Sequence, residues 1–69
     1  MDEVNILDAE WRQLDAELEV IRWRTQRLLR IGYEIREAAR LALSRIDIHE
    51  LEQLVGRGCP LETAVRIVA

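Results

Sequence analysis

Apolar residues recur along most of this chain at alternating steps of three and four. Two interleaved series, each with a period of seven, behave as the a and d positions of a heptad repeat. Thr25 and Gly32 are the two members that are neither apolar nor Ala. The pattern predicts one long helix with an apolar seam formed by Val4, Leu7, Trp11, Leu14, Leu18, Ile21, Thr25, Leu28, Gly32, Ile35, Ala39, Ala42 and Ile46.

Helix start and stop signals divide the chain into three segments of a single domain. Residues 1–5 are expected to be a frayed N-terminus, because Asn5 can cap a helix that begins near Ile6. The coiled-coil-like helix then covers residues 6–46. A short helical hairpin over residues 47–69 completes the chain.

The hairpin is predicted from local signals. Asp47 followed by Glu50 is a capping box in the broad sense, which opens the first short helix. Two glycines end that helix, and Pro60 is suited to the first turn of the second. Helices this short are unstable alone, so both must pack against the long helix.

The hairpin has an apolar pair, a glycine loop, an acid, a small residue and a closing apolar pair, at Leu54 and Val55, Gly58 and Cys59, Glu62, Ala64, and Ile67 and Val68. In this spacing it is similar to the first two helices of ubiquitin-associated domains. The resemblance covers about a quarter of the chain, and Cys59 stands where that family has an aromatic loop residue. We therefore interpret it as a general helical-hairpin solution rather than as membership of the family.

Gly32 allows two interpretations. As a helix C-cap it would end one helix and let residues 33–44 fold back as a second. As a seam residue it would let two helices approach closely. Because Leu28 and Ile35 remain in step across it, whereas a turn normally disturbs the heptad phase, we favour an uninterrupted helix.

Assembly with a second chain is expected from the length. A chain of 69 residues can bury only a marginal core, and a long helix cannot cover its own seam. We therefore predict an all-α, oligomeric helical bundle in which the long helix pairs with itself. The predicted self-association residues are Leu7, Trp11, Leu14, Leu18, Ile21, Leu28, Gly32, Ile35, Ala39 and Ala42.

The charge distribution predicts an antiparallel pair. Residues 1–21 carry seven acids and one Arg (net −6), residues 22–45 carry seven Arg and two Glu (net +5), and the whole chain has a net charge of −3. Acids flank the seam in the first half and Arg flanks it in the second, so antiparallel pairing joins opposite charges. The alternative is that the charges solvate the helix and pair within it, as Asp8 could with Arg12.

Trp23 lies outside the seam, at an f position, and should be covered by something. A partner copy's hairpin could cover it, with Arg27 stacked on its ring. Alternatively it anchors another protein. The predicted partner-binding residues are Trp23, Arg27, Arg30 and Tyr33.

The sequence offers little for catalysis or metal binding. His49 and Glu50 begin a zinc-protease-like pattern, but Gln53 replaces its second His. We expect His49 and the single cysteine, Cys59, to be structural, and we expect no cofactor. One cysteine, no signal-like start and no long apolar run lead us to expect a cytoplasmic location.

These observations predict a non-enzymatic protein–protein interaction or oligomerisation module that acts as an adaptor or regulator. The alternative is a small dimeric DNA-binding regulator that uses the seven Arg between Arg22 and Arg45 to neutralise phosphates.

Overall fold

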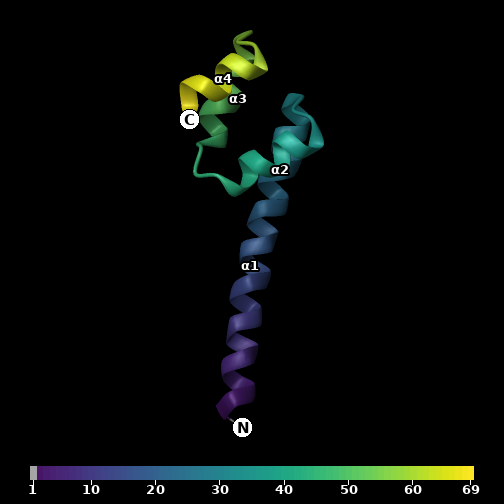
Figure 1. Cartoon of the computed structure of the whole chain (residues 1–69), viewed down its shortest axis with the longest axis vertical. Coiled ribbons are helices and arrows are strands. Elements are labelled where there is room, and N and C mark those ends of the chain that lie inside the picture. The colour runs from purple at the N-terminus through teal and green to yellow at the C-terminus, as the bar shows by residue number, and fades with distance from the viewer. Residues whose placement is uncertain (1) are drawn as a thin grey trace.

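The computed structural model describes the backbone of residues 2–69 and the side chains of residues 9–69. Over this range the chain forms four helices and no strand, so the all-helical prediction is confirmed (Figure 1). The helices are α1 (Asp2–Ile31), α2 (Ile35–Leu43), α3 (Ile48–Gly56) and α4 (Leu61–Val68).

The molecule is elongated, with extents of 55 × 18 × 15 Å. Figure 1 shows that the N-terminal part of α1 extends away from the other helices, which gather around its C-terminal end. Helix α1 contacts α2 and α3, and α3 contacts α4. We call residues 21–69 the compact end.

The prediction of one uninterrupted helix over residues 6–46 is wrong at Gly32. There φ is +122°, a left-handed conformation that glycine adopts without steric cost. The N–H of Gly32 donates to the carbonyl of Leu29 (3.1 Å), and that of Tyr33 donates to the carbonyl of Leu28 (3.2 Å). This pair of bonds is a Schellman motif, which ends α1 and lets α2 fold back along it.

The predicted helix start near Ile6 is also wrong, because α1 begins at Asp2. No Pro or Gly interrupts the sequence between Asp2 and Ile31, so this stretch contains no helix-breaking residue. The proposed cap at Asn5 lies outside the described side chains.

The short helices begin at defined caps. Glu34 caps α2 by accepting a hydrogen bond from the N–H of Glu37 (3.4 Å). Asp47 caps α3 by accepting from the N–H of Glu50 (3.2 Å), as its position before the apolar residues predicts. Pro60 precedes α4, where its missing N–H removes no intrahelical bond.

One apolar cluster holds the four helices together. It is built around Leu28 of α1 and Leu51 of α3, both completely buried, and Ile21 packs against its edge. Each fully buried leucine side chain contributes about 1.5–3 kcal/mol to the free energy of folding, so this cluster stabilises the compact end. Its buried members are Leu28, Tyr33, Ala38, Leu41, Ala42, Ile48, Leu51 and Ala64.

Candidate interaction surface

The first part of the predicted seam lies on the surface. Trp11, Leu14 and Leu18 are 68%, 45% and 54% exposed, although they occupy consecutive a, d and a positions of α1. All described side chains of α1 before Ile21 are exposed. We call Trp11, Leu14 and Leu18 the open seam, because no other helix of the chain covers them.

The second part of the seam is covered by the chain itself. Leu28 and Ala42 are buried in the core, and Ile21 is half-buried against it, so the prediction that they face a second copy is corrected. The helices that follow Gly32 cover the apolar face of α1 around Leu28. Leu7 lies outside the described side chains.

The inward face of α2 matches the heptad series only at Ala42. Its buried residues are Ala38, Leu41 and Ala42. Ile35, a predicted seam residue, is 56% exposed, and Ala39 is half-buried. The heptad spacing continues across Gly32. Because the chain reverses direction there, residues of the same series on α1 and α2 no longer lie on one continuous face.

Arg24 fixes residues 35–46, which run back along α1 and are called the returning segment, against α1. Its Nε donates to the carbonyl of Ala42 (3.0 Å), and its Nη2 donates to those of Ser44 (3.1 Å) and Ile46 (2.9 Å). A guanidinium presents several donors in a fixed fork, so one side chain can satisfy the carbonyls at the end of α2 and after it. The sequence pattern places Arg24 on the flank of the seam and among the seven Arg that could neutralise phosphates, and it does not predict these bonds to the backbone.

A groove lies between α1 and the residues at and just after the end of α2. It has a volume of about 620 Å³, with Val20 and Ile21 of α1 on one side and Ala42 and Arg45 on the other. The heptad pattern did not predict it. The spacing of Ala16 and Val20, four residues apart on one face of α1, was the signal for its α1 wall.

Trp23 lies on a different face of α1 from the open seam. Its side chain is 52% exposed, and the guanidinium of Arg27 lies 5.0 Å from the centre of its ring. Arg27 also forms an ion pair with Glu52 of α3. The predicted stacking of Arg27 on Trp23 is therefore present within one chain, where Arg27 links α1 to α3 as well.

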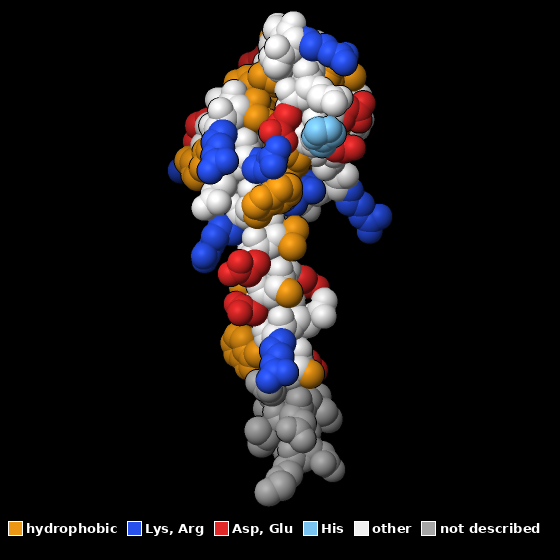
Figure 2. Space-filling view, turned by 180° about the vertical axis from the view of Figure 1, so that it is seen from behind, with side chains coloured by type: hydrophobic (Ala, Val, Ile, Leu, Met, Phe, Trp, Pro, Cys, Tyr) orange, Lys and Arg blue, Asp and Glu red, His pale blue; other side chains and the backbone are white. Residues whose placement is uncertain are grey.

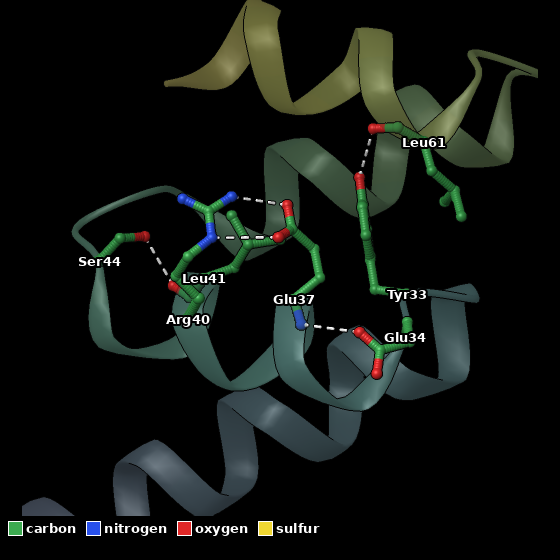
Figure 3. Close-up of polar contacts among 7 residues, drawn as sticks. All are labelled: Tyr33, Glu34, Glu37, Arg40, Leu41, Ser44 and Leu61. Carbon is green, nitrogen blue, oxygen red and sulfur yellow. Dashed lines mark hydrogen bonds and ion pairs between the residues drawn. The ribbon is translucent and has the colours of Figure 1, made fainter.

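Tyr33 does not belong to a partner-binding patch, because it is 6% exposed and part of the core. Its hydroxyl donates a hydrogen bond to the carbonyl of Leu61 (2.8 Å), which ties the turn after α1 to the start of α4 (Figure 3). Burial raises the pKa of this hydroxyl, and Cys59 and Glu37 nearby raise it further. The group is a structural donor.

The arginine cluster is divided between internal bonds and the surface. Arg40 pairs with Glu37 on α2 (2.7 Å), and this hydrogen bond lowers the pKa of the Glu37 carboxyl (Figure 3). Three of the seven arginines between Arg22 and Arg45 therefore have a guanidinium bonded within the chain: Arg24, Arg27 and Arg40. Figure 2 shows Arg side chains around the compact end. The other four, all exposed, are Arg22, Arg30, Arg36 and Arg45.

The remaining candidate residues form no metal cluster among the described side chains. His49 is exposed, with its Nε2 3.4 Å from Nε2 of Gln53, and Cys59 is half-buried. Within the part of the chain that the structure describes, no helix is long and apolar enough to cross a membrane.

Comparison with known proteins gives no relative. No protein-family model, curated protein or solved structure matches the chain.

Proposed function

We propose that this chain is a non-enzymatic protein–protein interaction module, an adaptor or regulator, whose working surface is the open seam of α1. The observation that carries the proposal is the exposure of Trp11, Leu14 and Leu18 at heptad spacing. An uncovered apolar stripe of this kind on a helix is the typical docking face for another helix. The compact end anchors α1 and leaves its N-terminal part accessible.

Self-association is one form of this role. An antiparallel pair of α1 helices would cover the open seam of both copies. The predicted antiparallel pair, which joins the acidic half of one helix to the basic half of the other, needs the seam residues beyond Ile21. Leu28 and Ala42 of that seam are buried in the core of their own chain. What remains is a shorter overlap near the N-terminus, over the open seam.

A selection experiment tests the proposal even though the partner is unidentified. The full chain serves as target for a displayed library of amphipathic 21-residue helices, and a Leu14→Asp/Leu18→Asp variant serves as counter-target. We expect enriched helices that bind the wild type and lose binding to the variant. In a Trp23→Phe background, Trp11 is the sole tryptophan, and its quenching by acrylamide should fall when such a helix binds.

The control variant is Trp11→Phe, in which Trp23 reports on a face outside the seam and should remain accessible. Light scattering on the wild type and on the Leu14→Asp/Leu18→Asp variant measures self-association in the same series. Equal enrichment on target and counter-target, with equal mass for both proteins, would refute the proposal.

DNA binding is the second candidate, supported by Arg22, Arg30, Arg36 and Arg45 on the surface. Three other arginines of the cluster are bonded within the chain, which reduces the charge that could reach phosphates. A titration with generic duplex DNA at moderate salt distinguishes the two roles. Tight binding that weakens steeply with salt would favour the DNA-binding role.

A further inference from the structure

We infer that the open seam is built for a helix of another protein whose apolar a and d residues are flanked by Lys or Arg, and not for a second copy of this chain. The inference rests on the proposed function and names the partner class. It follows from the charges beside Trp11, Leu14 and Leu18. It also follows from the burial of Leu28 and the backbone bonds of Arg24, farther along α1.

Acids flank the open seam on both sides. Glu10 and Glu17 occupy g positions, Asp15 occupies an e position, and all three are exposed. In a coiled coil the e and g residues of one helix face those of its partner. Any symmetric pairing centred on the open seam therefore places carboxylates against carboxylates, whether the two copies run parallel or antiparallel.

Sliding the two copies does not remove this conflict. For an antiparallel pair to bring Asp15 of one copy to Arg22 of the other, Trp11 of the first would have to pack against Leu28 of the second. Leu28 is completely buried in its own core. Arg24, the next basic flank, is held by three carbonyls of the returning segment.

A partner with basic flanks meets no such conflict. Its Lys or Arg side chains would face Glu10, Asp15 and Glu17 while its apolar residues cover the seam. The site ends where the compact end begins, at Ile21, which packs against the core. About 18 residues of α1 precede that point from Val4, which is roughly 27 Å of helix, so a partner helix of about three heptads fills it.

Two matched peptides test the inference on the full chain. Both have three heptads with Leu at a and d; one has Lys and the other Glu at every e and g position. We expect the Lys peptide to bind one to one, about tenfold or more tighter than the Glu peptide at low salt, by calorimetry at pH 7. The difference should shrink at 1 M salt because the flanking charges are exposed.

Charge-reversed variants provide the internal control. Glu10→Lys/Asp15→Lys/Glu17→Lys should reverse the preference between the peptides. Glu19→Lys/Glu50→Lys/Glu62→Lys changes the net charge equally at exposed positions outside the seam flanks, and it should keep the wild-type preference. Far-UV circular dichroism verifies that each variant keeps its helix content.

The outcomes separate the inference from the proposed function. A wild-type dimer at neutral pH and low salt that Leu18→Asp dissociates would overturn the inference and leave the proposed function standing, with a second copy as the occupant. A preference that follows net charge in both triple variants would also overturn it. If neither peptide binds to the wild type and Leu18→Asp leaves the mass measured by light scattering unchanged, the proposed function fails as well.

Discussion

Leu18 and Leu28 lie on the same helix and in the same apolar seam, yet one is more than half exposed and the other is completely buried. The difference lies in what the rest of the chain does. After Gly32 the chain returns and covers the seam of α1 at Ile21 and Leu28, whereas Leu18 stays more than half exposed. The same pattern thus serves an internal core at one end of α1 and an external surface at the other.

The largest expected effect comes from shortening these two leucines. Leu28→Ala should lower the free energy of unfolding by about 2–5 kcal/mol, because it leaves a cavity in the core. Leu18→Ala should change it by less than about 0.5 kcal/mol, because its side chain is largely solvated. Urea unfolding followed by circular dichroism measures both. Equal losses would mean that Leu18 is covered in solution, and the contrast between the regions would disappear.

Arg24 tests what holds the returning segment on α1. Arg24→Met should cost about 1.5–3 kcal/mol in unfolding free energy, because charged hydrogen bonds to three carbonyls are lost. Arg22→Met removes the same charge from an exposed position two residues earlier and should be nearly neutral. Hydrogen exchange of the amides of α2 would locate the loosening. If both variants behave alike, Arg24 does not hold the segment.

Gly32 tests the turn that separates the two regions. Gly32→Ala should destabilise the chain by about 1–2 kcal/mol, because alanine is strained at a φ of +122°. Its added methyl group would meet Leu61 Cδ1 at 3.6 Å, an ordinary contact, so strain rather than crowding causes the loss. Gly56→Ala is the control, since φ there is not positive and the space is open. A stabilised Gly32→Ala chain would favour the uninterrupted helix.

The smallest effect concerns the hydroxyl of Tyr33. Tyr33→Phe should cost about 0.5–1.5 kcal/mol, the net value of one hydrogen bond. Folding raises the pKa of this group, so its contribution is complete below its ordinary pKa of about 10 and is lost as pH rises through the folded value. Urea unfolding at neutral and alkaline pH compares the two proteins. Their difference in stability should narrow at alkaline pH, and a constant difference would contradict this assignment.

Local signals predicted much of the fold. Asp47 placed the start of α3, and Gly32 was recognised as a possible helix end. The prediction of an uninterrupted helix is wrong at Gly32 because the heptad phase continues across a Schellman turn, whose signature is an apolar pair at Leu28 and Tyr33 on either side of the glycine. Phase alone cannot distinguish a helix that continues from one that reverses and reuses the same spacing.

The candidate surface was predicted in part. The heptad series identified Trp11, Leu14 and Leu18, and it also named Leu28 and Ala42, which the core occupies. Tyr33 was assigned to a partner although its ring completes the core and its hydroxyl bonds to Leu61. Burial depends on which segments return to a position, and this information is not local to the residues concerned.

The sequence by itself determined that the chain is helical, that α1 carries an apolar seam and that acids flank the first half of this seam, since periodicity and charge order are properties of the chain alone. Only the tertiary structure decided which part of the seam stays open. The left-handed turn at Gly32 and the bonds of Arg24 bring α2 back over one end of α1, and α2 ends at Leu43, which leaves the open seam exposed.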